Sequence, residues 1–236
     1  MNQEQIAFPA SVLVIMAHPD DLEFMVGGTV ARWIIQGATV HLLLATRGEA
    51  GNERHPQWSS REVARVREDE QRAAQELLGI AGITYLEEPD GELVASTGLR
   101  RRLVQEIRQL RPEAVILPDP TLYYRETHVN HPDHRAIGEA ALAAVFPNAG
   151  NPMYHPELGA AHQLKQVWIT MATQPNAWVD ITDFLDKKLA AIACHTSQVG
   201  HVVELEHRIK AWAAHTDQSG KLTHREWFRL IDFHGA

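Results

Sequence analysis

The sequence predicts an α/β protein with a Rossmann-like three-layer α/β/α architecture and a mostly parallel central sheet. Three observations support this: short aliphatic stretches alternate with helical periodicities, the connections are brief, and the first stretch ends abruptly in polar residues. Such βαβ alternation is typical of a parallel sheet covered by helices on both faces. The sequence has no internal repeat, low-complexity tract or linker, so residues 1–236 are expected to form a single domain.

The expected strands are short aliphatic or β-branched stretches: Val12–Met16, Thr39–Ala45, Thr84–Glu87, Ala114–Leu117 and Gln166–Met171. Helical periodicity occupies the intervals between them, over Gly28–Gln36, Arg61–Leu78, Gly98–Leu110 and Asp133–Val145. Gly79 is suited to the C-cap of the second helix. Pro112 ends the third helix, because the residue before a proline is pushed out of helical space.

The pattern changes after Phe146. Pro147–His162 is rich in Pro, Gly, Asn and His, and we expect it to form a loop over the functional site. Two further helices are expected at Asp183–His195 and Val203–His215. Gly27-Gly28 lacks the spacing of a dinucleotide-binding turn, and the carboxylates before it would repel phosphates. We interpret this pair as a site of close packing between helix and sheet.

Composition excludes several classes of protein. The hydrophobic content of 44% and charged content of 22% are ordinary for a globular domain. A net charge of -8 and a pI near 5.9 argue against a nucleic-acid partner, whose binding surface should be basic. We find no signal-peptide pattern and no apolar run long enough for a membrane span, so we expect a cytoplasmic protein. Cys194 is the single cysteine, which excludes an internal disulfide, and we interpret it as a buried, inert thiol.

Charged residues follow the first expected strand directly, as His18-Pro19-Asp20-Asp21. A divalent metal is the simplest compensation for so many polar groups at the end of a core strand. A second cluster, His131-Pro132-Asp133-His134, repeats this chemistry more than a hundred residues later. Two histidines and one carboxylate suffice for a catalytic zinc site, which requires an open position for water.

Spacing distributes the roles within the first cluster. His18 and Asp21 are three residues apart and share one side of a helical first turn, with His134 as the third ligand. Asp20 is then free to act as a base on metal-bound water, whose pKa falls toward roughly 7. In the alternative interpretation, each cluster only caps a helix and His18 is a surface residue. Two such clusters at the starts of two helices argue against that alternative.

Six motifs, taken together, resemble the LmbE-like (PIG-L) family of zinc-dependent N-acetylglucosamine deacetylases. In chain order they are AHPDDLEFMVGGTVA, TRGEAGN, REDEQRAAQELLG, EPDGEL, HPDHRAIG and HTSQV. AHPDD and HPDH are highly specific as a pair, and the others are supporting. The resemblance covers nearly the whole chain. It implies removal of the acetyl group from N-acetylglucosamine in glycoconjugates, such as thiol precursors, chito-oligosaccharides or a phosphatidylinositol glycolipid.

The resemblance also implies a role for particular residues. One Zn²⁺ per chain would be held by His18, Asp21 and His134, with Asp20 as the general base. His131 would stabilise the oxyanion or protonate the leaving amine, and Asp133 would orient His131. Relatives assemble as trimers or hexamers, so the resemblance implies a homo-oligomer.

Three further positions match family residues near the substrate. Arg67 matches an arginine that reaches the active site, where it could bind a carboxylate on the aglycone; a solvated arginine paired with Glu70 or Asp69 is an equal alternative. Asp90 matches an aspartate that contacts sugar hydroxyls. His195 stands where relatives carry histidine or tyrosine, although on sequence alone it would be a histidine ending a helix.

Some alternatives stay open at this point. Some relatives carry a catalytic tyrosine where this chain has Val129, so Tyr123 or Tyr124 would replace it or the oxyanion would rest on zinc and His131 alone. Iron, cobalt or nickel suit the same ligands. A zinc amidase for a different acyl group and a non-catalytic sugar-binding relative are the rival functions. Intact Asp20 and His131 argue against the latter, and a phosphoesterase would need ligands for two ions.

Overall fold

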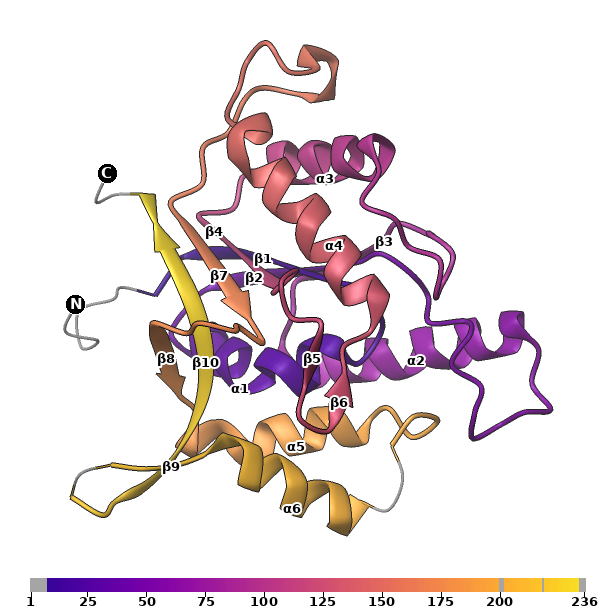
Figure 1. Cartoon of the computed structure of the whole chain (residues 1–236), viewed down its shortest axis with the longest axis vertical. Helices are drawn as coiled ribbons and strands as arrows, with labels where there is room; N and C mark the ends of the chain where they lie inside the picture. The colour runs from indigo at the N-terminus through magenta and orange to yellow at the C-terminus, as the bar shows by residue number, and fades with distance from the viewer. Residues whose placement is uncertain (1–7, 200–201, 218, 234–236) are drawn as a thin grey trace.

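The computed structural model describes residues 8–199, 202–217 and 219–233, and it confirms the three-layer α/β fold (Figure 1). The central sheet has the strand order β3-β2-β1-β4-β7-β10-β8, and β9 pairs with β10 at the side. Its strands are β1 Ser11–Met16, β2 Thr39–Leu44, β3 Gly82–Tyr85, β4 Ala114–Pro118, β7 Gln166–Thr170, β8 Ala177–Asp180, β9 Ala214–Thr216 and β10 Leu222–Asp232. A separate hairpin pairs β5 Tyr124–Arg125 with β6 His128–Val129.

Helices cover both faces of this sheet. They are α1 Asp21–Ile35, α2 Ser60–Leu78, α3 Thr97–Leu110, α4 Pro132–Ala143, α5 Leu185–Ala193 and α6 Val202–Ala213. Short helical turns occur at η2 Ala144–Ala149, η3 Pro156–Leu158 and η4 Thr182–Phe184. In Figure 1, α3 and α4 lie on one side of the sheet, and α1, α2, α5 and α6 lie on the other.

Strand β1 lies in the middle of the parallel part of the sheet and contributes to two hydrophobic cores. Val12, Val14 and Met16 pack into the core that includes α1 and α5. Leu13 and Ile15 point the other way, into the core that includes α3 and α4. Because side chains alternate along a strand, a strand covered on both faces is apolar at every position. This double burial explains why β1 is the clearest strand signal in the sequence.

The C-terminal third differs most from the sequence-based expectation. Strands β8, β9 and β10 were not expected, and neither was the β5–β6 hairpin. β10 runs antiparallel between β7 and β8. It alternates buried residues such as Phe228 and Leu230 with exposed charged ones such as Arg229, so it lacks the apolar run typical of a parallel strand. His215, expected to end a helix, lies in β9.

Helix α1 begins at Asp21 rather than at Gly28, so the end of the His18–Asp21 cluster forms its first turn. The interpretation of Gly28 as a close-packing position is confirmed. A Cβ atom built at Gly28 would lie 2.7 Å from Cβ of Ile181, which follows β8 directly. Only a glycine therefore allows α1 to approach this segment so closely.

The expectation that Pro147–His162 covers the site is wrong. In Figure 1, helix α4 begins beside β6 and carries the chain away from the β5–β6 hairpin to the far end of the molecule. There Arg108, near the end of α3, donates hydrogen bonds to main-chain carbonyls of this segment, at Asn148, Ala149, Asn151, His155 and Gly159. His162 Nε2 lies 2.6 Å from the carbonyl of Pro112, just before β4. The segment therefore closes the far end of the molecule.

A buried ion pair connects the last strand to the first helix. Glu226 on β10 accepts hydrogen bonds from the main-chain N–H groups of Gly28 and Thr29, at 3.0 and 2.7 Å. Lys188 on α5 pairs with Glu226 and also donates to the carbonyl of Phe24. Polar groups buried this deeply need such partners. These contacts fix α1, which begins with Asp21 of the first cluster, against β10 and α5.

Candidate metal centre

The two histidine clusters meet at the carboxyl ends of β1 and β4. These strands are parallel neighbours, so the residues after them emerge at the same edge of the sheet. The first cluster follows β1 directly and begins α1. The second cluster follows the β5–β6 hairpin and begins α4. The two clusters, more than a hundred residues apart in sequence, are therefore in direct contact.

His18, Asp21 and His134 converge as expected. Asp21 Oδ1 lies 3.0 Å from His134 Nε2, and Asp21 Oδ2 lies 3.5 Å from His18 Nδ1. Their potential ligand atoms are all within 4.8 Å of one another. Two imidazoles and one carboxylate in this arrangement fit a catalytic zinc ion, with a position left for water or substrate. The donor chemistry therefore fits the metal expected from the sequence.

Neighbouring groups fix each of these ligands. The Asp21 carboxylate accepts the N–H groups of Ala17 at 3.2 Å and His18 at 2.9 Å. Burial opposes ionisation of Asp21, but His134 and His18 outweigh it and lower its pKa well below the usual value. His134 Nδ1 lies 3.0 Å from Oδ1 of Asn130. Such contacts on the outer nitrogen orient a metal-binding imidazole.

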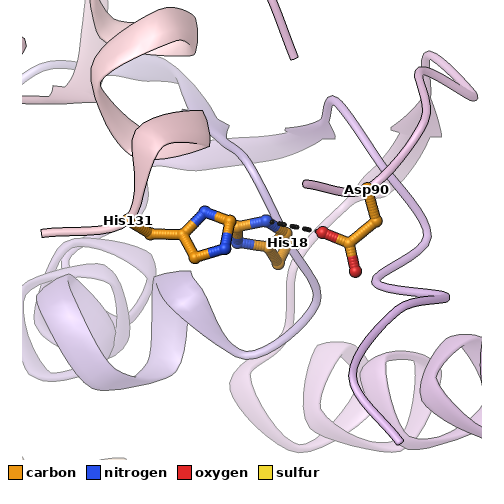
Figure 2. Close-up of side chains that lie close together, drawn as sticks. All are labelled: His18, Asp90 and His131. Carbon is orange, nitrogen blue, oxygen red and sulfur yellow. Dashed lines mark ion pairs between the residues drawn. The ribbon is translucent and has the colours of Figure 1, made fainter. Parts of the chain in front are cut away.

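The outer nitrogen of His18 faces two carboxylates. His18 Nε2 is 3.0 Å from Asp90 Oδ1, as Figure 2 shows, and 3.3 Å from Asp133 Oδ2. Burial lowers the pKa of His18, but the hydrogen bonds to Asp133, Asp21 and Asp90 outweigh burial and raise it well above the usual value. A proton on Nε2 would satisfy these carboxylates and would leave Nδ1, beside Asp21, to face an ion.

This arrangement gives Asp90 and Asp133 contacts that differ from the sequence-based roles. Asp90 lies on His18 and accepts the N–H of Ala50 at 3.0 Å. The Asp133 carboxylate is 4.0 Å from His131 Nδ1 and instead accepts the N–H groups of Gly91 at 2.8 Å and Leu93 at 3.2 Å. Asp133 therefore anchors His18 and the segment after Asp90, while its own N–H donates to His131 Nδ1 at 3.2 Å.

His131 and Val129 are both exposed to solvent. The His131 ring stands edge-on to His18, with 4.6 Å between ring centroids, and 43% of its side chain is exposed. Burial and the neighbouring His18 lower the pKa of His131. Val129 is exposed on β6 opposite Tyr124, which is exposed as well. The Arg135 guanidinium covers the exposed Tyr123 ring at 4.7 Å.

Asp20 occupies the N-cap position of α1, but its side chain makes no capping hydrogen bond, so the helix-capping interpretation of the first cluster is wrong. Its backbone is left-handed, with φ of 94°. Asp20 Oδ2 lies 3.2 Å from Nη2 of Arg67. Burial raises the pKa of Asp20 to about 6 against the opposing charge of Arg67.

Arg67 reaches this centre but is buried. Its guanidinium donates to the carbonyls of Gly48 at 3.0 Å and Pro19 at 2.6 Å, in addition to Asp20. The alternative of a solvated arginine paired with Glu70 or Asp69 is wrong. Gly48, with φ of 68°, supplies the space, because a Cβ there would lie 2.5 Å from the guanidinium carbon. The GEAGN motif thus accommodates the arginine.

His195 directly follows the C-cap of α5, as expected of a histidine that ends a helix, and it is fully buried beneath the centre. Its Nε2 lies 3.4 Å from Oε2 of Glu23, also fully buried. Burial lowers the pKa of His195, but Glu23 outweighs it and raises the value. The following Thr196 and Ser197 bind Glu70 on α2. Cys194 is only partly buried, and burial with nearby carboxylates raises its pKa, as expected of an inert thiol.

Sequence reasoning missed three polar residues around the centre. Asn130 orients His134, and Gln71 and Glu23 form a buried hydrogen bond of 2.7 Å behind Asp20. Gln71 carries a detectable signal, because it lies four residues after Arg67 and therefore on the same face of α2. Glu23 is one turn into α1, where its carboxylate has no sequence-level reason to be buried.

Comparison with known proteins identifies the family. Residues 13–145 match the PIG-L family model, described as GlcNAc-PI de-N-acetylase. The chain belongs to the PIG-L family. It is 36% identical over 191 residues to diacetylchitobiose deacetylase of Thermococcus kodakarensis, covering 79% of this chain and 69% of the relative. It is 29% identical over 194 residues to a probable N-acetyl-alpha-D-glucosaminyl L-malate deacetylase 2 of Bacillus anthracis, covering 79% and 80%.

A solved PIG-L structure extends the similarity to nearly the whole chain. N,N'-diacetylchitobiose deacetylase from Pyrococcus horikoshii, in complex with an inhibitor, superposes with a TM-score of 0.86 at 29% identity. The match covers 95% of this chain and 84% of that protein. Among the described residues, no helix has the length and apolar character needed to cross a membrane.

Proposed function

We propose that this PIG-L protein is a zinc-dependent N-deacetylase that releases acetate from an N-acetylglucosamine-containing small molecule or glycoconjugate. The observation that carries the proposal is the convergence of His18, Asp21 and His134, with ligand atoms within 4.8 Å of one another, beside the Asp20 carboxylate, which makes no helix-capping hydrogen bond and pairs with Arg67. Deacetylases of N-acetylglucosamine compounds among the relatives support the substrate class.

His18, Asp21 and His134 would hold the ion. When bound, zinc supplies a Lewis acid that polarises the acetamide carbonyl and lowers the pKa of water. Other divalent transition metals suit two imidazoles and a carboxylate as well. The buried contacts of Asp21 and His18 to main-chain N–H groups and carboxylates hold the ligand atoms in place before any ion binds. Such preorganisation limits the cost of forming the site.

Asp20 and His131 would carry the proton transfers. The Asp20 carboxylate takes a proton from the attacking water, whose oxygen bonds to the acetyl carbon. The amide C–N bond breaks, and the proton passes to the departing amine from Asp20 or from His131. The partly exposed His131 ring, beside His18, is also placed to donate a hydrogen bond to the developing oxyanion. The products are acetate and a free glucosamine.

Acetate release from a small panel of substrates tests this function. The panel contains N-acetylglucosamine, N,N'-diacetylchitobiose and the inositol and malate glycosides of N-acetylglucosamine, each with zinc-loaded protein. We expect equal amounts of acetate and free amine from at least one member, and loss of both with Asp20→Asn. If the loaded protein binds these sugars but releases acetate from none, the non-catalytic alternative is correct.

The rival amidase function is separated by the acyl group. Replacing the N-acetyl group of the best substrate by N-butyryl should lower kcat/KM by at least about tenfold if the enzyme is a deacetylase, because one or two extra methylenes can be rejected by a fitted pocket. A faster reaction with the longer acyl group would instead favour the amidase.

A further inference from the structure

The Pro19–Asp20 peptide group is held at both ends by one helix. Its carbonyl accepts a hydrogen bond of 2.6 Å from Arg67, and its N–H donates a hydrogen bond of 3.0 Å to Oε1 of Gln71. Arg67 and Gln71 are four residues apart on α2, so they lie on the same face of the helix. Two contacts of opposite polarity fix the plane of this peptide.

That peptide plane determines the backbone conformation of Asp20. A φ of 94° is uncommon for any residue other than glycine, and such strained conformations persist only where the surroundings impose them. The side chain gives no help from a capping hydrogen bond. The contacts from α2 therefore contribute to holding Asp20 in this conformation, in which its carboxylate contacts Arg67 and makes no capping hydrogen bond.

Gln71 is itself fixed by a second buried contact. Its amide nitrogen donates to Oε1 of Glu23 at 2.7 Å, and both side chains are fully buried. A carboxylate accepts only, so it must face the amide NH₂ group and directs the amide oxygen toward the N–H of Asp20. Glu23 thereby selects the one orientation of Gln71 that supports Asp20.

His195 contacts Glu23 and is the last member of this group of buried residues. Its Nε2 lies 3.4 Å from Glu23 Oε2, and within the described part of the chain neither His195 nitrogen has a hydrogen-bond partner of good geometry. A buried ion pair with incomplete hydrogen bonding is weak evidence for stability, since an apolar pair of the same volume would often do as well. The position of the His195–Glu23 pair behind Asp20 suggests that the pair supports Asp20 rather than overall stability.

We propose that Gln71, Glu23 and His195 are positioning residues that hold Asp20 in its productive conformation. Gln71 fixes the Pro19–Asp20 peptide, Glu23 fixes the orientation of Gln71, and His195 balances the charge of Glu23. The inference rests on the proposed deacetylase function in one respect only, the role of Asp20 as base. The conformation of Asp20 can be measured without any substrate.

Gln71→Met tests the first link, because it removes both hydrogen bonds at nearly constant volume. We expect kcat to fall by about tenfold to a hundredfold, the cost of a misplaced catalytic group, with KM and zinc content unchanged. Gln75→Met is the matched control: it is the same substitution one turn later on α2, where the Gln75 side chain donates a hydrogen bond to the carbonyl of Ile80 and makes no contact with Asp20 among the described residues. It should leave kcat at the wild-type value.

An exchange of two side chains tests the second link. Gln71→Glu alone places a second carboxylate against Glu23 and should lower kcat further than Gln71→Met. The double variant Gln71→Glu/Glu23→Gln restores an amide facing a carboxylate and an acceptor for the Asp20 N–H. It should recover most of the lost kcat, so the two changes are strongly non-additive. Additive losses would overturn the proposed chain of contacts.

Crystal structures of the wild type and Gln71→Met separate this inference from the proposed function. We expect Asp20 to leave the left-handed region, or its peptide to rotate, in the variant. An unchanged peptide, or a wild-type kcat in Gln71→Met, overturns the positioning role. A wild type that releases no acetate from any substrate, combined with a rotated peptide in the variant, overturns the function and leaves the positioning role standing.

Discussion

At the scale of single residues, Arg67 is the clearest departure from the sequence-based hypothesis. Binding of an acidic aglycone was expected, yet its guanidinium donates to Pro19, Gly48 and Asp20 and is almost fully buried. A guanidinium committed to these groups has no free face for a substrate carboxylate. Arg67 supports the segment that carries Asp20, and we expect other groups to recognise a charged substrate.

We therefore predict that Arg67→Lys lowers kcat/KM equally on neutral and acidic substrates. The ammonium group cannot reproduce the planar, several-sided contacts, and a loss of about tenfold or more follows from the displaced loop. N,N'-diacetylchitobiose and the malate glycoside of N-acetylglucosamine are the pair to compare. Arg72→Lys, at an exposed ion pair with Asp69 on the same helix, is the control. A loss confined to the malate glycoside would restore the original hypothesis.

His195 makes stability depend on pH. Its folded-state pKa is raised above the usual 6.5 because Glu23 outweighs the effect of burial. A raised pKa means that the folded state holds the proton more tightly, so this stabilisation is complete below about pH 6.5 and disappears as pH rises through the folded-state value. The difference in unfolding free energy between wild type and His195→Gln should be larger at pH 6 than at pH 9. Urea titrations at both pH values measure it, and a constant difference would contradict the ion pair.

The convergence of His18, Asp21 and His134 was predictable from sequence, but the partners of the residues around them were not. His18, Asp20 and Asp21 share one turn, so the roles proposed for them follow from their spacing. Asp133 binds main-chain groups of Gly91 and Leu93, about forty residues away, and nothing local to Asp133 indicates that. Burial also decides whether a polar residue such as His195 faces substrate or supports another residue, and burial depends on the whole fold.

At the scale of elements, α1 can pack closely against the segment after β8 because Gly28 has no side chain. Gly28→Ala would place a Cβ 2.7–2.8 Å from three atoms of Ile181. We predict a destabilisation of about 1–3 kcal/mol from overpacking. Chemical denaturation measures it. Gly28→Ala/Ile181→Ala should lose less stability than the sum of the two single variants, and full additivity would show that the two positions do not share this contact.

The parallel half of the sheet was predicted well and the antiparallel half was missed. β1, β2 and β4 are buried on both faces, so their apolar runs are unmistakable. β10 carries charged residues at alternate positions, and one of them, Glu226, is buried for its bonds to α1. The start of α1 was placed seven residues too late because His18–Glu23 is dominated by functional groups rather than by helix-forming periodicity.

At the scale of the whole molecule, the ion should contribute to stability. Asp21, Asp90 and Asp133 crowd around His18, and a divalent cation relieves their mutual repulsion. We predict that chelation lowers Tm and that added zinc restores it. A ligand at a thousand times its Kd stabilises by about 4 kcal/mol. Differential scanning calorimetry of wild type and His134→Ala checks this, because the variant should lose most of the zinc response. An equal response in both would place the stabilising ion elsewhere.

The position of β10 sets a condition on biosynthesis. Among the described strands, β8 pairs with β10 alone, and Glu226 contacts Gly28 across 198 residues of chain. A ribosome that adds about 5–20 residues each second has therefore completed the motif of Asp20 and Asp21 long before its last support exists. A nascent chain that stops before Leu222 leaves β8 unpaired and Lys188 without its carboxylate. The first residues of the candidate site to be synthesised must therefore wait for the last described strand to be made.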